Sequence, residues 1–336
     1  MATIILRSIN AALTARQAKG LISRSSTVLV ESSKNYQKGA ALCQQRFHSA
    51  SNNTRIISIN GTWTFLRNWS TASTESERSD NFSLSWKRPP GPPKVWKRIE
   101  SATESRIKTK DEKPLKFTVE EVPVERVEDA VDLMANYFIP DEVICNSLKI
   151  KDDPLAVQDC RDLWRLALRQ GISVAVFLED SSVELREIAA VNVIFVMTPE
   201  DEKKLKNYKV QSLPLKSKRT KPVLEYVFSV TDKINVMKHY GVDKFMAGFG
   251  MTVNPRFRGH SLGGYLLGSR NEIGREYNLR ATETSFTGPA SQTLALRSGF
   301  EILWQKKYSE LYDENGKPLF PDVKIEYCTM MGKRLD

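Results

Sequence analysis

The alternation of apolar and polar residues becomes regular at residue 116 and predicts a folded domain from there onward. Residues 116–123 alternate with the two-residue period of a strand, and residues 124–138 place apolar side chains at helical spacing. A second amphipathic helix is predicted over 153–171, with Gly171 as its C-terminal cap. The start of the domain is therefore expected to be one strand followed by two helices.

The later segments complete a mixed pattern. Helices are predicted at 225–241, 264–278 and 289–299, and strands at 172–180, 185–197, 244–253, 279–286, 301–311 and 323–331. The first two of these strands flank turn residues and are expected to form a β-hairpin. Residues 203–221 contain eight lysines and arginines and no acid, which is typical of a solvated loop. The order of elements predicts the α/β (α+β) class, with a mixed central sheet and helices on both faces.

Residues 75–115 are rich in serine, proline and charge and carry little periodic apolar signal. We predict a linker here, stiffened toward polyproline II by the run 88–93. Trp86 and Trp96 are interpreted as solvent-exposed linker aromatics, with docking on the domain or on a partner as the alternative. The predicted organisation is a basic segment over 1–74, the linker over 75–115 and the domain over 116–336.

The first 74 residues carry most of the charge. They contain nine lysines and arginines and one acid, so they hold +8 of the formal net charge of +10, and the other 262 residues hold +2. Residues 1–24 are amphipathic, basic and acid-free, which is typical of a mitochondrial transit peptide. We expect a disordered N-terminal extension that directs the protein to the mitochondrial matrix. The alternative is a disordered basic tail on a cytoplasmic protein.

Composition argues against several classes of protein. No apolar run approaches the roughly 18 residues that a membrane span needs. The cysteines show neither CxxC nor Cys/His ligand spacing, which argues against a zinc site and a disulfide framework; they are Cys43, Cys145, Cys160 and Cys328. The nearly neutral body argues against a nucleic-acid partner. We therefore expect no metal, no nucleic acid and no membrane span, and a monomer is taken as the expected state.

The stretch "VNPRFRGHSLGGYLL", residues 253–267, joins a predicted strand to a predicted helix through a glycine-rich turn. A helix N-terminus presents free N–H groups and about half a positive charge, and glycines let an anion approach the main chain. The turn is therefore interpreted as a pyrophosphate cradle, with Arg256 and Arg258 supplying counter-charge. Its spacing differs from GxxxxGK[ST] and from GxGxxG. A glycine turn that only serves packing is the alternative.

This turn resembles the acetyl-CoA motif of the GNAT superfamily of N-acetyltransferases, R/Q-x-x-G-x-G/A after a strand that ends in V-x-P. Arg258 corresponds to the first position, Ser261 to the first glycine and Gly263 to the last small residue. The stretch "SFTGPASQTLALRSGFEIL" is similar to the last helix of that superfamily and ends on its Gly-Phe pair. Within the superfamily, "FIPDEVICNSL" and "YSELYDENGKPLF" resemble segments of the insect arylalkylamine (dopamine) N-acetyltransferase branch. The resemblance covers about residues 116–332 and implies a GNAT-type acyltransferase fold.

The resemblance implies acetyl-CoA as co-substrate. Its pantetheine arm would pair with the edge of the strand ending at Val253, as an added strand does. The implied CoA-binding residues are Met251, Thr252, Val253, Arg258, Gly259, His260, Ser261, Leu262, Gly263 and Gly264. Serine at 261 stands where the motif has glycine, and it would either crowd the phosphate or donate one more hydrogen bond. The His260 ring is expected either to contact the phosphate or adenine side or to be simply exposed.

The resemblance also implies catalytic residues. Glu142, the E of "DE", corresponds to a general base that acts through water, with a solvated helix-terminal carboxylate as the alternative. The tyrosine that many members use as general acid is absent, because Ala295 occupies its position. Ser291 and Thr287 match two serines of the insect branch, so Ser291 is a candidate proton donor, with a helix-capping hydroxyl as the alternative. Tyr308 is a further candidate.

Two functions follow from these residues. The first is acetyl transfer from acetyl-CoA to a small primary, arylalkylamine-like amine in a ternary complex. The second is a non-catalytic acyl-CoA-binding or scaffold protein of mitochondria that keeps the fold, suggested by Ser261 and by "DEVI" where the insect branch has "DEPL". Shape rather than composition decides the amine, so the sequence leaves its identity open.

Overall fold

The computed structural model describes residues 54–59, 62–67, 84–101, 114–179, 185–206, 216–231 and 233–335. The chain divides into two compact units, of which one is residues 11–81 and the other contains residues 82–336. In the first unit, β1 (Thr54–Ile59) and β2 (Thr62–Arg67) form an antiparallel pair. Apart from this pair, the predicted transit-peptide-like segment lies outside the described residues. Within the described part of the chain, no helix is long and apolar enough to cross a membrane.

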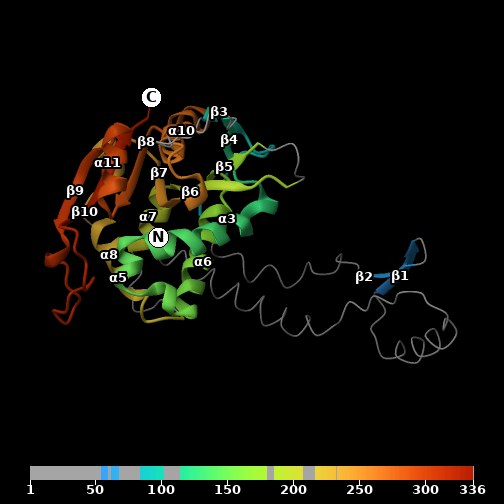
Figure 1. Cartoon of the computed structure of the whole chain (residues 1–336). Coiled ribbons are helices and arrows are strands. Elements are labelled where there is room, and N and C mark those ends of the chain that lie inside the picture. The colour runs from blue at the N-terminus through green and yellow to red at the C-terminus, as the bar shows by residue number, and fades with distance from the viewer. Residues whose placement is uncertain are drawn as a thin grey trace. The chain divides into compact units, whose positions relative to one another are not determined.

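The second unit is built on an eight-stranded sheet of order β3-β4-β5-β6-β7-β8-β10-β9 (Figure 1). The strands are β3 (Val95–Ser101), β4 (Leu115–Glu121), β5 (Val174–Leu178), β6 (Ile188–Met197), β7 (Phe245–Val253), β8 (Ala281–Phe286), β9 (Glu301–Lys307) and β10 (Tyr327–Arg334). Neighbouring strands are antiparallel except β7 and β8, which are parallel. Their pairing covers only Met246 with Thr282 and Ala247 with Glu283, so the two strands separate toward their C-terminal ends.

Helices cover both faces of this sheet, as the sequence predicted. They are α3 (Val127–Leu133), α4 (Ile139–Asp141), α5 (Val143–Ser147), α6 (Pro154–Leu168), α7 (Pro199–Lys206), α8 (Lys221–Thr231), α9 (Val236–Tyr240), α10 (Leu262–Tyr277) and α11 (Pro289–Arg297). Leu266 and Ile273 of α10 pack in one buried cluster with Ile194 and Val196 of β6. Phe195, between those two β6 residues, points to the opposite face, where α3 and α6 contact β6.

The linker prediction is wrong for residues 84–101, which belong to the domain. Strand β3 pairs with β4 along its length, and the guanidinium of Arg88 contacts the buried carboxylate of Glu121 at 2.6 Å. Trp86 and Trp96 pack edge-on against Tyr277, with ring centroids 5.8 and 6.2 Å away. Docking, rather than exposure, is therefore the outcome for both tryptophans. Strand pairing and one buried ion pair hold a segment whose composition alone indicates a linker.

Two helix predictions need correction. The segment predicted as one helix over 225–241 is two helices, because Asn235 caps α9 by accepting a hydrogen bond from the Lys238 N–H at 2.8 Å. Gly241 ends it in the left-handed conformation, as predicted. The helix predicted over 124–138 contains a π-helical turn, Met134–Phe138. The basic stretch predicted as a loop begins inside α7, and its middle, residues 207–215, lies outside the described residues.

Candidate active site

The glycine turn connects β7 to α10, and its two most informative residues have left-handed backbones. Gly259 has a φ of 88°. Ser261, the residue that caps α10, has φ 56° and ψ 21°, so a serine adopts the conformation that glycine favours. Its side chain is exposed and makes no capping hydrogen bond. Backbone of this kind before a helix turns successive N–H groups outward, which is the geometry of an anion-binding nest.

Of the two glycines in the first turn of α10, Gly263 serves packing, whereas the space at Gly264 would accept a Cβ. A Cβ at Gly263 would lie 3.1 Å from Leu294 Cδ2 of α11, and one at Gly264 would lie 3.9 Å from Leu294 Cδ1. Gly263 therefore lets α10 approach α11 closely, while Gly259 supplies the turn conformation. The packing interpretation of the motif therefore applies to Gly263, and the anion cradle stays a prediction for the turn at Gly259 and Ser261.

The basic residues of the turn are paired with carboxylates. The guanidinium of Arg258 donates to Asp141 at the end of α4, and that of Arg256 donates to Glu187 at 2.8 Å. Asp141 thus links the turn to the segment that carries Glu142. The imidazole of His260 is 4% exposed and packs edge-on against Phe117. The alternative of simple exposure is wrong, because the ring is buried against Phe117, whereas its contact with the phosphate or adenine side stays a prediction.

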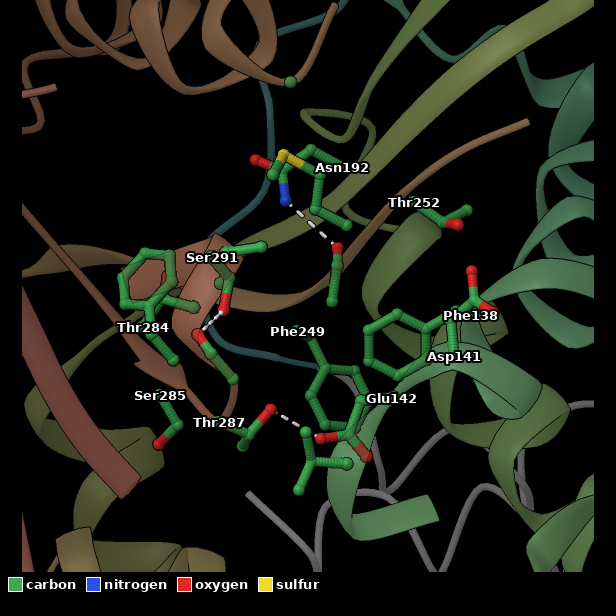
Figure 2. A pocket seen from close by; sticks show the side chains of 18 of the residues that line it. Phe138, Asp141, Glu142, Asn192, Phe249, Thr252, Thr284, Ser285, Thr287 and Ser291 are labelled. Carbon is green, nitrogen blue, oxygen red and sulfur yellow. Dashed lines mark hydrogen bonds between the residues drawn. The ribbon is translucent and has the colours of Figure 1, made fainter. Parts of the chain in front are cut away.

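Strand β7 contains a β-bulge next to the turn. Asn192 of β6 faces Met251, and Ile194 faces Gly248, so Phe249 and Gly250 lie in a register shift. Trp164 Nε1 donates to the Phe249 carbonyl at 3.1 Å, and Asn192 Nδ2 donates to the Gly250 carbonyl at 3.0 Å (Figure 2). Because β8 has separated from β7 here, the edge of residues 248–253 has no paired strand on its β8 side within the described residues. This edge can accept an extended ligand arm.

Glu142 lies between α4 and α5 and points toward α11. Its backbone is extended, and one carboxylate oxygen accepts the Cys145 N–H at 2.7 Å as the cap of α5. The other oxygen accepts the Thr287 hydroxyl at 2.6 Å (Figure 2). The side chain is thus both a helix cap, which was the alternative interpretation, and part of a cavity wall. Two donors hold its orientation.

The three hydroxyls proposed as proton donors have different surroundings. Thr287 donates to Glu142, and Ser291 donates to the Gly288 carbonyl at 2.8 Å (Figure 2). Ser291 therefore makes the local bond expected of a hydroxyl at a helix start, while still lining the cavity. Tyr308 is buried, donates to the Thr287 carbonyl at 2.9 Å and does not line the cavity. Burial raises the pKa of Tyr308, and its hydroxyl supports the Thr287 carbonyl outside the cavity.

One cavity of about 820 Å³ joins these parts. The predicted site residues that line it are Glu142, Met251, Thr252, Val253, Arg258, Gly259, Ser261, Leu262, Gly263, Thr287 and Ser291, whereas His260 and Gly264 do not. Much of the remaining wall is apolar and aromatic, with Phe138 and Phe249 (Figure 2) and Trp164, which come from three different elements. Such a cavity suits a mostly apolar small molecule that a few polar groups orient.

Arg270 is a cavity residue that sequence reasoning missed. Arg270 of α10 is fully buried, and its hydrogen bonds go to neutral oxygens of Asn192, Thr282 and Thr284 at 2.9–3.2 Å. Burial lowers the pKa of Arg270 to about 10. No grouping of His, Cys, Asp and Glu suited to a metal ion occurs among the residues that the structure describes.

No protein-family model and no curated protein sequence matches the chain. Solved structures do. A protein of the yellow fever mosquito Aedes aegypti assigned as arylalkylamine N-acetyltransferase 7 is 27% identical, with a TM-score of 0.64, over 75% of this chain and 100% of that one. Arylalkylamine N-acetyltransferase 2 of Aedes aegypti is 21% identical, with a TM-score of 0.57, over 66% and 99%.

The polyamine N-acetyltransferase of Drosophila melanogaster, which forms N-acetylagmatine, is 16% identical, with a TM-score of 0.55, over 65% of this chain and 100% of that one. At this identity the likeness concerns the fold. The mixed sheet, the separation of β7 from β8 and the glycine turn before α10 agree with it. These likenesses support a GNAT-superfamily N-acetyltransferase that is similar to the insect arylalkylamine N-acetyltransferases.

Proposed function

We propose that the protein transfers the acetyl group of acetyl-CoA to a small primary amine by direct attack in a ternary complex. The observation that carries this proposal is the single cavity with the glycine turn at one end and the Glu142–Thr287 pair in its wall. In support, the 27% identical mosquito structure is assigned as an arylalkylamine N-acetyltransferase. The pyrophosphate would lie on the N–H groups before α10, and the pantetheine arm along the free edge of residues 248–253.

The reaction needs a base because the amine is protonated in water. An alkylamine has a pKa near ~10.4, so at pH 7.4 about one molecule in a thousand is neutral, a handicap of about 4 kcal/mol. Glu142 would accept a proton from the ammonium, directly or through water. The nitrogen then bonds to the thioester carbonyl carbon, the carbon–sulfur bond breaks and sulfur keeps the electron pair. Nitrogen loses its second proton and the thiolate gains one, so the products are the N-acetylamine, CoA and one released proton.

The proton for the thiolate would come from the α11 side of the cavity. Ser291 has a hydroxyl there whose own proton is given to the Gly288 carbonyl, so it must rotate to donate to sulfur. Thr287 is held by Glu142 and can pass a proton only when Glu142 carries one. We therefore assign Thr287 as a positioning residue for Glu142, and Ser291 as the group that orients the sulfur.

The test is release of free thiol from acetyl-CoA by the full chain with a panel of primary amines, compared with Glu142→Gln. Asp243→Asn is the matched control, because this carboxylate is 84% exposed and lies before the start of β7, at the opposite end of that strand from the turn. We expect turnover that Glu142→Gln abolishes and the control retains. Tight CoA binding in calorimetry without turnover of any amine would instead select the non-catalytic acyl-CoA-binding protein.

We propose a mitochondrial location on the basis of the amphipathic, acid-free residues 1–24. Imaging of the full chain with a C-terminal tag, beside a chain that lacks residues 1–74, tests it. A diffuse cytoplasmic signal from the full chain would refute the proposal without bearing on the chemistry.

A further inference from the structure

Glu283 of β8 is a buried carboxyl without a partner. Its side chain belongs to a residue that is 6% exposed, and it makes no hydrogen bond or ion pair with any residue that the structure describes. Its Oε2 atom is completely buried. A buried carboxylate in this state is costly, because it loses its water without gaining donors. Such a carboxyl either stays protonated or becomes stable as a carboxylate when a cation binds to it.

The position of Glu283 on β8 places its side chain on the face of the sheet opposite α10. Alternation along β8 puts Thr282 and Thr284 on the face of α10, where both hydrogen-bond Arg270, and puts Glu283 with Ser285 on the opposite face. Glu283, Ser285 and Tyr226 all line the cavity. The Tyr226 hydroxyl is buried beside Ser285 without forming a hydrogen bond of normal geometry. The inner wall of the cavity therefore holds two polar groups that lack partners.

Two charged residues act on Glu283 at a distance without forming an ion pair with it. Burial raises the pKa of Glu283 to about 7, the guanidinium of Arg270 lowers it and the carboxylate of Glu202 on α7 raises it. The Arg270 guanidinium forms no ion pair with Glu283 and donates its hydrogen bonds to neutral oxygens. A cation that entered the cavity would thus meet a carboxyl that ionises near neutral pH and has both oxygens available.

The spacing from the reaction centre fits a bifunctional amine. Thr287, which holds Glu142, follows Glu283 by four residues, a span of about 13 Å in an extended chain. The cavity wall near this path includes Phe249 and Val227, which offer apolar contact to an alkyl spacer. A molecule whose reacting amine meets Glu142 can therefore place a second group near Glu283.

We propose that Glu283 binds a second cationic group of the substrate, so that the preferred amines are alkyl diamines or guanidino-alkylamines rather than amines with a neutral tail. The proposal rests on the proposed acetyl transfer at Glu142. A neutral tail leaves the carboxyl buried without a partner, whereas an ammonium or guanidinium supplies the donors that it lacks.

The test compares two amines that differ in one group. Cadaverine and hexylamine have the same length, with a methyl in hexylamine where cadaverine has its second amine. We expect the wild-type chain to have a kcat/KM for cadaverine at least about tenfold above that for hexylamine, the discrimination typical of a charged hydrogen bond. Glu283→Gln keeps the shape and should reduce this ratio to near one, mainly by raising the KM for cadaverine while hexylamine is turned over as before.

The possible results separate the two proposals. If neither amine, nor any other in a panel, releases thiol, the proposed function fails. If hexylamine and phenethylamine are turned over but cadaverine is no better, the role of Glu283 is refuted. If Glu283→Gln changes thermal stability and leaves the ratio of the two amines unchanged, Glu283 is a structural counter-charge of Arg270 and the proposal is equally refuted. The wild-type ratio needs no variant, so the test stands even if the substituted chain fails to fold.

Discussion

Substitution of Glu142 by glutamine should remove the base while leaving the fold intact, and the structure sets the size of both effects. Glu142 accepts the Cys145 N–H as the cap of α5, and losing a cap costs about 1 kcal/mol. This is small against the 5–15 kcal/mol by which domains are stable, so the variant should remain folded. The lost base should lower kcat by about 10²–10⁴-fold at pH 7.4. Activity and stability should therefore separate clearly.

The pH dependence gives the sharper test of this role. Each unit of pH above 7.4 increases the neutral fraction of the amine about tenfold until its pKa near ~10.4, so hydroxide progressively replaces the missing base. The deficit of Glu142→Gln in kcat/KM should shrink as pH rises, while thermal melts at the same pH values show both chains folded. A deficit that stays constant with pH, or a variant as active as the wild type at pH 7.4, would refute the assignment of Glu142 as base.

Three further predictions concern stability and binding. Ser261→Gly removes a serine whose left-handed backbone costs about 1–2 kcal/mol, so the melting temperature should rise or stay the same. Calorimetry should show a CoA affinity within about threefold of that of the wild type. A larger loss of affinity would mean that the Ser261 hydroxyl binds phosphate. Arg88→Ala leaves the buried Glu121 carboxylate without its cation, although the Lys94 N–H and the Tyr277 hydroxyl still donate to it, so denaturant melts should lose about 3 kcal/mol. No loss would contradict the docking of residues 84–101. The pKa of Glu283 is raised from 4.5 to about 7 in the folded state, so the free energy of unfolding of the wild type should fall by about 3 kcal/mol as pH rises from 4.5 to 7. Glu283→Gln should lack this decrease. Parallel curves of unfolding free energy against pH for the two chains would show that the carboxyl is solvated.

Local signals predicted those parts of the fold that depend on neighbouring residues. The hydrophobic period located most helices and strands, and Gly241 ended a helix as expected, because capping depends on a few adjacent positions. The helix before Gly171 instead ends at Leu168 with Arg169 as its cap. Residues 84–101 were missed for the opposite reason. Their place in the domain depends on Glu121 and Tyr277, which lie far along the chain, and a proline-rich composition indicates a linker whenever such partners are not visible.

The candidate site shows the same division. The turn before α10 is a continuous motif, so the sequence located it as the connection between a strand and a helix, but it did not indicate that the His260 ring packs on Phe117. Glu142 and Thr287 were each proposed from resemblance, but their hydrogen bond joins segments 145 residues apart and is visible only in the fold. Tyr308 illustrates the limit, since its hydroxyl is a plausible acid in sequence and a buried support for Thr287 in space.

Arg270 and Glu283 were not predicted because nothing local marks them. Each is a single charged residue in a helix or strand whose pattern is otherwise that of an ordinary amphipathic element. Charged residues in such elements are usually exposed. What buries both is the separation of β7 from β8 just after the pair Ala247–Glu283, together with Gly248, where a Cβ would lie 2.7 Å from the Arg270 guanidinium. A larger residue at 248 would push the guanidinium away, so the glycine, the arginine and the carboxyl depend on one another. The proposed binding of a second cation at Glu283 therefore predicts that Gly248→Ala, whose Cβ would lie 2.0 Å from Thr284 Oγ1 and 2.7 Å from the Arg270 guanidinium, disturbs the discrimination between cadaverine and hexylamine as Glu283→Gln does.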